Sequence, residues 1–426
     1  MKTPMFLLPC LHQVVFSLCM SGLVGVLAGP AHAAPFVGGG VVVSVVGDGT
    51  TPITTGTVVV PITLTEYTTT GSLTGGGVTL PGVDAGANYA TTASMSSTSF
   101  GFLKRSLDGN YLTMTGANVP AGTQVSAFSS GLYPNRTIAR IDTAGNVDTS
   151  TRFNAAGTTP RSAITTTGTN FWWSGDTGSG NTGGIRYMAL SATTSGPALA
   201  QGSGASATTA GQPAPVPYNM RVLNIFNGQL YGTSGVAVGA SGANQASFRG
   251  VFNVGTGLPT TANQFGSLIA GSGTGNAGLQ DSPYDFFFAD ASTLYVGDDD
   301  TTAPVTGGIT KWLLSGTTWT KTWLALPGGA TGVRALAGLT DAGSGTVELY
   351  GVTAVASGQN QLVKLIDTLS GTSAPSFSVL ATAPSNYLFR GVALSPVAVP
   401  EPSTCASLLA GLACGGYLMR CRRTRA

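Results

Sequence analysis

A short strand-like element recurs along this chain and constrains its fold more than any other feature of the sequence. In this element, two large apolar residues follow a polar or turn-forming lead, and the chain then usually returns to Gly, Thr or Ser. The occurrences begin at Tyr111, Phe171, Leu230, Leu294 and Leu349. They are 60, 59, 64 and 55 residues apart. Such a constant interval indicates an internal repeat.

A second set of apolar runs follows the first in phase, at residues 140–142, 183–187, 248–251, 307–312 and 362–365. Both sets are rich in β-branched and aromatic residues and are bounded by Gly, Asn and Asp, which is typical of strands and turns. The body of the chain shows no sustained apolar period of 3.6 residues, so few helices are expected. We therefore predict an all-β fold whose repeats each contain a strand pair and an outer strand.

Repeats of this length that contain only strands are typical of a β-propeller, whose blades are small antiparallel sheets stacked around an axis. The length of the body, residues 34–404, predicts six blades, with seven as the alternative. A pair of β-sandwiches or a β-helix is a second interpretation. Residues 389–394 have no partner strands after them, and the strands at 41–46 and 58–64 have none before them. We expect these ends to pair within one blade and so to close the ring.

The first 33 residues have the layout of a secretory signal peptide. Lys2 supplies a positive charge, residues 14–27 are apolar, and Ala31 and Ala33 occupy the −3 and −1 positions of a cleavage site. We expect a signal helix that is removed, so that the mature chain begins at Ala34. An uncleaved anchor is the alternative, but the apolar run is shorter than the roughly 20 residues that span a bilayer.

Removal of that segment leaves the body without histidine or cysteine. Both histidines and two of the five cysteines lie in the segment, and the other cysteines are Cys405, Cys414 and Cys421. A Ser-His-Asp triad, a cysteine nucleophile, a His/Cys zinc site and a structural disulfide are therefore excluded between residues 34 and 404. An exported body of this kind is held together by packing alone or with bound calcium.

The C-terminal residues 399–426 combine three features in order. Pro400, Glu401 and Pro402 come first, and a mostly apolar segment at residues 405–419 follows. The chain then ends in a basic group that consists of Arg420, Arg422, Arg423 and Arg425. As a helix the apolar segment is about 22 Å long, short for a hydrocarbon core of about 30 Å. We predict a C-terminal transmembrane helix whose arginines stay in the cytoplasm, so that the body is held outside the inner membrane.

This order resembles the PEP-CTERM sorting signal of Gram-negative bacteria that make extracellular polysaccharide. The resemblance implies that an exosortase, a membrane-embedded cysteine transpeptidase, recognises Pro400-Glu401-Pro402 and processes the chain near it. It covers only residues 399–426, although the body also resembles the propeller-like ectodomains of other PEP-CTERM proteins. A plain tail anchor, with the tripeptide as a stiff linker, is the alternative.

Few residues of the body are candidates for catalysis or for ligand binding. Asp298, Asp299 and Asp300 form the densest acidic cluster, for which calcium is a conceivable ligand. The sequence lacks an Asp-x-Asp-x-Asp-Gly loop, and consecutive strand residues point to opposite faces. We therefore predict a solvated turn and no metal site.

The five tryptophans invite a carbohydrate-binding interpretation, because flat aromatic faces stack on sugar rings. Trp172 and Trp312 fall on the repeating strands and are expected to pack between blades. Trp173, Trp319 and Trp323 are the candidates for exposure, although a position in the blade core is the favoured prediction for them as well.

Only 8% of the residues are charged, and 19 Lys+Arg nearly balance 17 Asp+Glu, so nucleic acid is not an expected partner. The sequence predicts a signal peptide at 1–33, a propeller-like ectodomain at 34–398 and a sorting segment at 399–426. The favoured hypothesis is an exported, non-catalytic envelope or extracellular-matrix protein without a cofactor. Its expected partners are an exosortase, the membrane and, as a candidate ligand, extracellular polysaccharide. The alternative is a calcium-dependent propeller hydrolase or lactonase that uses carboxylates in the central channel.

Overall fold

The structure is a computed structural model that describes most of residues 34–397. Within that span it leaves out residues 54–55, 130, 177–182, 201, 204–206, 209–218, 236–248, 265, 272–281, 301–306, 329–330 and 356–358. The predicted signal peptide and the predicted sorting segment with its transmembrane helix both lie outside the described residues. Among the residues that are described, no helix combines the length and the apolar character of a membrane span.

Four sheets of four antiparallel strands follow one another along the chain, and each is a simple meander. The first contains β9 (Pro160–Ile164), β10 (Asn170–Gly175), β11 (Gly184–Ala189) and β12 (Ala198–Ala200). The second contains β15 (Met220–Phe226), β16 (Gln229–Ser234), β17 (Gly250–Val254) and β18 (Gly266–Gly271). The third contains β19 (Pro283–Phe288), β20 (Thr293–Asp298), β21 (Gly308–Ser315) and β22 (Thr318–Ala325). The fourth contains β23 (Gly332–Asp341), β24 (Thr346–Ala354), β25 (Gln361–Thr368) and β26 (Phe377–Thr382).

The other strands form two further meanders that share hydrogen bonds. One contains β1 (Val41–Gly47), β2 (Val59–Tyr67) and β3 (Leu73–Thr79), and β27 (Tyr387–Leu394) pairs on its β1 edge. The other contains β5 (Lys104–Arg105), β6 (Tyr111–Ala117), β7 (Asn135–Asp142) and β8 (Val147–Asn154). Between them, β4 (Thr92–Ser94) pairs with both β2 and β6. The described residues also include the helix α1 (Val125–Ser129) and a hairpin of β13 (Gly202–Ser203) and β14 (Ala207–Thr208).

The two ends of the described chain pair with one another. β27 runs antiparallel to β1, with Val43 opposite Val392 and Val45 opposite Phe389. β1 pairs on its other side with β2. The prediction that both ends share one sheet is therefore confirmed, and β1 has a neighbour along each edge.

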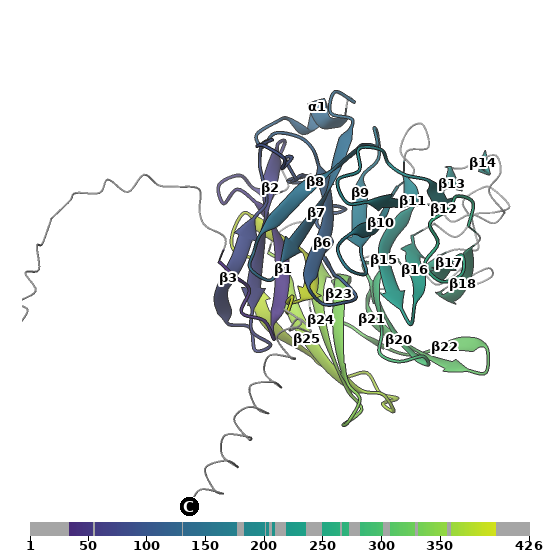
Figure 1. The fold of residues 1–426 in the computed structure, drawn as a ribbon. Coiled ribbons are helices and arrows are strands. Elements are labelled where there is room, and N and C mark those ends of the chain that lie inside the picture. The colour runs from purple at the N-terminus through teal and green to yellow at the C-terminus, as the bar shows by residue number, and fades with distance from the viewer. Residues whose placement is uncertain are drawn as a thin grey trace, which may run out of the picture. The chain divides into compact units, whose positions relative to one another are not determined.

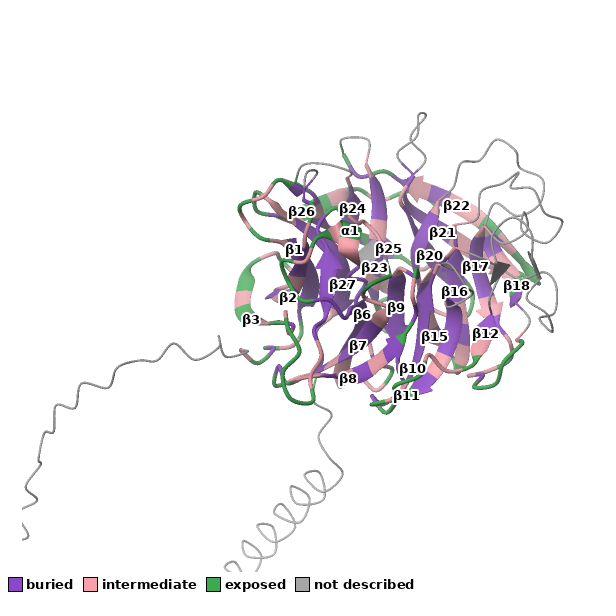
Figure 2. Cartoon of the chain, turned by 90° about the horizontal axis from the view of Figure 1, so that it is seen from above, coloured by how far each residue is buried: buried purple, intermediate pink, exposed green. Residues whose placement is uncertain are grey.

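One strand of each meander contributes to a closed cycle at the centre. β27 contacts β5, β5 contacts β9, and the contacts continue through β15, β19 and β23 back to β27. We call β27, β5, β9, β15, β19 and β23 the central strands. Figures 1 and 2 show the sheets side by side in chain order, and Figure 2 shows that many buried residues lie toward the middle. The described body is therefore all-β and propeller-like, as the sequence predicts.

The sequence repeat corresponds to one position in these sheets. The five apolar pairs lie within β6, β10, β16, β20 and β24, which are the strands next to a central strand. The second set of apolar runs overlaps the next strands outward, namely β7, β11, β17, β21 and β25. The repeat thus arises from the middle of each sheet, where both faces are covered by neighbours.

The hydrophobic core lies between neighbouring sheets. Phe288 and Val296 pack with Val251 of the preceding sheet, and Ile309 packs with Leu349 of the following one. Burial of such side chains stabilises the fold by about 1.5–3 kcal/mol each. These layers hold the sheets together without any disulfide in the described residues, because residues 34–397 contain no cysteine.

Candidate functional site at the centre of the ring

Five of the six central strands have a break in pairing register. A break of this kind is a β-bulge, which leaves a residue without a ladder partner and redirects its side chain. The first residues in the breaks are, in chain order, Arg161, Arg221, Tyr284, Arg334 and Arg390. We call the four arginines the arginine cluster.

Hydroxyl groups of the preceding sheet hold the backbone at two of these breaks. Ser174 Oγ, on β10, donates a hydrogen bond of 2.6 Å to the carbonyl of Arg221. Thr233 Oγ1, on β16, donates one of 2.5 Å to the carbonyl of Tyr284. Both hydroxyls come from the strand next to a central strand. Because a bulge deprives carbonyl groups of ladder partners, these hydroxyls supply the missing hydrogen bonds to the next central strand.

Arg221 and Arg334 share one carboxylate beside the ring of Tyr284. Asp299, which directly follows β20, has one oxygen 3.3 Å from Arg221 Nη1 and the other 2.9 Å from Arg334 Nε. The guanidinium carbon of Arg221 lies 4.4 Å from the centre of the Tyr284 ring, and that of Arg334 lies 5.9 Å from it. Burial raises the pKa of Asp299, but the two arginines outweigh burial and hold the pKa below its ordinary value.

Arg390 is the most buried member of the arginine cluster and has no carboxylate beside it. It is 2% exposed, and its Nη2 donates a hydrogen bond of 3.0 Å to the carbonyl of Met95. Its buried Nε has no hydrogen-bond partner among the described residues. Burial lowers the pKa of Arg390 to about 9, and the nearby charge of Arg334 adds to the effect.

Arg161 completes the cluster. Its Nη1 donates hydrogen bonds to Asn219 Oδ1 and to the carbonyl of Met220, over 2.5 and 2.9 Å. Asp176 lies 3.9 Å from its Nη2. Burial lowers the pKa of Arg221, and repulsion from Arg161 contributes to the same direction. The four guanidinium groups are therefore electrostatically linked.

Two contacts join β5 and β19, which lie on opposite sides of the cycle. The ring of Phe102, just before β5, stacks on Tyr284 with ring centres 4.7 Å apart. Lys104 Nζ lies 2.5 Å from Asp285 Oδ1, and Asp285 Oδ2 accepts a hydrogen bond from the amide of Leu336. Burial raises the pKa of Asp285, while the ion pair with Lys104 opposes this shift. These contacts connect the two sides of the ring across its middle.

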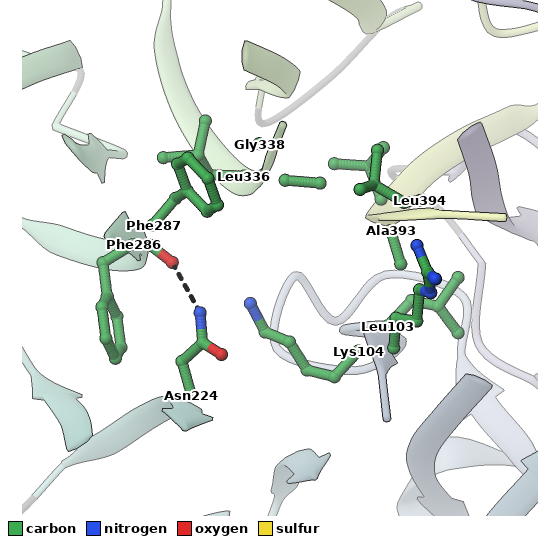
Figure 3. A pocket seen from close by; sticks show the side chains of 12 residues that line it. Leu103, Lys104, Asn224, Phe286, Phe287, Leu336, Gly338, Ala393 and Leu394 are labelled. Atoms are coloured by element: carbon green, nitrogen blue, oxygen red, sulfur yellow. Dashed lines mark hydrogen bonds between the residues drawn. The ribbon is translucent and has the colours of Figure 1, made fainter. Parts of the chain in front are cut away.

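A small pocket lies beside Lys104 (Figure 3). Its volume is about 110 Å³, and it is lined by residues of β5, β15, β19, β23 and β27. Figure 3 shows the Lys104 ammonium group near Asn224, whose Nδ2 donates a hydrogen bond of 3.2 Å to the carbonyl of Phe286. Ligand pockets usually measure about 300–1,000 Å³, so this space suits a few water molecules better than a ligand. The arginine cluster is therefore the stronger candidate site.

The acidic residues at the end of β20 are not a solvated turn, which corrects the prediction from sequence. Asp298 is 3% exposed and Asp300 is 7% exposed. Asp298 accepts hydrogen bonds from the amides of Ser282 and Asp300, whereas Asp299 binds the two arginines. In the described part of the chain, no group of three or more His, Cys, Asp or Glu side chains is arranged so that it could hold a metal ion.

The tryptophans are mostly core residues. Trp172, Trp173 and Trp323 are buried, and Trp172 Nε1 donates a hydrogen bond of 2.7 Å to the carbonyl of Pro259. Trp172 packs between two sheets, as predicted. Trp312 and Trp319 are half-buried and pack against the cluster between β15–β18 and β19–β22. None of the five is fully exposed.

The sequence analysis did not single out the arginine cluster. Arg161 and Arg221 are 60 residues apart, and Arg334 and Arg390 are 56 apart, so their spacing follows that of the strand repeat. Tyr284 lies between Arg221 and Arg334 in this series, at the corresponding position of its own sheet. In a chain with 8% charged residues, arginines in phase with a repeat are the pattern that could have revealed the site.

No protein-family model and no curated protein matches this chain. Among solved structures, it is similar to the extracellular domain of a protein described as a one component system of B. thetaiotaomicron, at 12% identity and a TM-score of 0.34. That match covers 80% of this chain but only 34% of the other, so this chain spans about a third of its length. A glucose dehydrogenase matches at 12% identity and a TM-score of 0.36, over 72% of this chain and 91% of its own. An exo-β-1,3-galactanase from Clostridium thermocellum matches at 10% identity and a TM-score of 0.38, over 65% and 60%.

These comparisons correct the expectation that the chain is not an enzyme. The similar structures include a glucose dehydrogenase, the exo-β-1,3-galactanase and two β-1,3-galactosidases, and all of these names describe enzymes. We therefore do not propose a non-catalytic role for this chain. At identities of 10–12%, the matches assign no activity, substrate or ligand to this chain.

Proposed function

We propose that the protein is exported, loses residues 1–33 and is sorted to the cell envelope or the extracellular matrix through its C-terminal segment. The observation that carries this proposal is the order of Pro400-Glu401-Pro402, an apolar segment and a terminal arginine group. In this proposal, an exosortase-type enzyme and the inner membrane are the partners of the C-terminal segment.

We further propose that the body of the exported chain is a propeller of six blades. The four separate meanders are four blades, the meander of β27, β1, β2 and β3 is a fifth, and that of β5–β8 is a sixth. The closed cycle of central strands supports this count, because each blade contributes one strand to it. Extracellular polysaccharide is the proposed ligand, since the sorting signal that the C-terminus resembles belongs to bacteria that make it.

Immunoblotting of cell fractions, with and without the exosortase-type enzyme, tests the proposal. With the enzyme, we expect a shorter product in the outer envelope or the medium. Without it, we expect a longer product in the inner membrane. Glu401→Ala should reproduce the second result in cells that have the enzyme, whereas Asp341→Asn, in an exposed turn of the body, should be processed normally. An unchanged mass and location in both strains would remove the sorting proposal.

A further inference from the structure

Among the described residues, the carboxylates near the arginine cluster are fewer than its guanidinium groups. They are Asp176, Asp298 and Asp299. Asp299 is divided between two arginines, and Asp298 already accepts hydrogen bonds from two backbone amides. Lys104 and Asp285 neutralise one another. Arg390 therefore remains without a countercharge among the described residues.

A buried guanidinium without a countercharge is unfavourable, because water that would solvate it has been removed and no anion replaces it. Arg390 is 2% exposed and its Nε has no acceptor in the described structure. The buried Nε atoms of Arg161 and Arg221 lack one as well. Arg390 thus combines an unpaired N–H donor with an uncompensated charge, and an acidic group beside it would supply both the acceptor and the countercharge.

We infer that the arginine cluster binds an oxyanion, a carboxylate or phosphate group carried by a ligand, beside Arg334 and Arg390. The planar guanidinium group presents parallel N–H donors that match the two oxygens of such a group. Bulges of central strands from four different sheets bring the arginines together, so the site depends on the closed ring rather than on one loop. Its residues lie outside the sorting segment, so the inference does not depend on the proposed sorting of the chain.

Two members of the cluster are partly exposed to solvent. The side chain of Arg221 is 11% exposed and that of Arg334 is 14% exposed, whereas Arg390 is nearly inaccessible. The stack of Phe102 on Tyr284 fills the ring next to Arg221 and leaves little room for a large group. The site therefore suits a single acidic group, with the rest of the ligand in solvent.

Thermal unfolding and calorimetric titration of the purified full chain in detergent test the inference. The chain is compared in sodium chloride, sodium phosphate and sodium glucuronate at equal pH and ionic strength. Because a ligand that binds only the folded state raises its stability, the unfolding midpoint should rise and saturate with phosphate, with glucuronate or with both. A response to phosphate alone or to glucuronate alone supports the site and identifies which source of the oxyanion it accepts.

Variants separate binding from general salt effects. Arg390→Met keeps the length and apolar stem of the side chain, and should weaken anion binding at least tenfold. Its unfolding midpoint in chloride should equal or exceed that of the parent, because the unpaired charge is gone. Arg140→Met, which removes an arginine paired with Asp148 outside the cluster, should retain the full response to anions. The inference is overturned by an absent response in the parent chain, or by equal responses in the parent and Arg390→Met. Should Arg390→Met fail to fold, Arg334→Met takes its place, with the same required loss of binding.

Discussion

Lys104 Nζ lies 2.5 Å from Asp285 Oδ1, and the two residues belong to central strands on opposite sides of the cycle. Both side chains are buried, so each charge depends on the other for compensation. The pair thus ties together two sheets that share no strand–strand hydrogen bonds.

Replacing one partner of this pair should be far more harmful than replacing both. Lys104→Met leaves a buried carboxylate and should lower the free energy of unfolding by about 3–5 kcal/mol. The double variant Lys104→Met/Asp285→Asn should lose much less, because no charge is left unpaired. Urea unfolding of the four chains measures the coupling, and additive losses would contradict it. The half-buried pair of Arg140 and Asp148 is the control, for which we expect a coupling of about 1 kcal/mol or less.

The hydroxyl of Thr233 should contribute to stability through the carbonyl of Tyr284. Thr233→Val keeps the shape of the side chain but leaves that buried carbonyl without its 2.5 Å hydrogen bond. We expect a loss of about 1–3 kcal/mol in the free energy of unfolding, measured with urea. Thr63→Val is the matched control, because the Thr63 hydroxyl bonds only to Thr79 at the surface. Equal effects of the two substitutions would show that the contact at the bulge is unimportant.

Asp299 should make stability depend on pH in the acidic range. Its folded-state pKa is below its unfolded value, so its contribution is complete above about pH 4 and is lost as the pH falls through the folded value. Asp299→Asn should therefore cost about 3 kcal/mol at pH 7 and progressively less below pH 4. Unfolding curves of both chains between pH 2.5 and 7 measure the difference. A constant difference over this range would refute the assignment.

Loss of β27 should expose an edge of β1. A chain that ends after Asn386 lacks the partner of Val43 and Val45, and an unpaired strand edge associates with other chains. We expect this chain to form oligomers or aggregates in size-exclusion chromatography and to unfold at a lower temperature. A chain that ends after Val397 keeps β27 and should stay monomeric. Identical behaviour of the two truncated chains would mean that the pairing does not protect β1.

The strands next to the centre could be predicted because their sequences are regular. Leu294 and Tyr295 of β20 are both buried, as are Leu349 and Tyr350 of β24, so both faces of these strands carry large apolar residues. The central strands could not be predicted in the same way. Their bulges interrupt the alternation of the strand, and Arg390 introduces a charged residue among buried apolar ones. A local pattern does not reveal that such a residue points toward the middle of a ring.

The role of Asp299 could not be predicted for a different reason. Adjacent carboxylates repel one another unless they are exposed or neutralised, and the nearby sequence offers no cation. The neutralising groups are Arg221 and Arg334, which lie 78 and 35 positions away in the chain. Only the cycle of central strands brings these three residues together. Sequence patterns therefore identified the acidic cluster, while its environment depended on tertiary structure.

The pairing of β1 with β27 also sets an order of events during biosynthesis. The amide of Gly391 donates a hydrogen bond to Ser44 Oγ across 347 positions of the chain. One of the first strands to be synthesised can therefore pair with β27 only after nearly the whole body has been made. Contacts between such distant segments form slowly, because a very long loop must close first. A nascent polypeptide with this topology cannot close its ring of sheets until nearly all of it has been made.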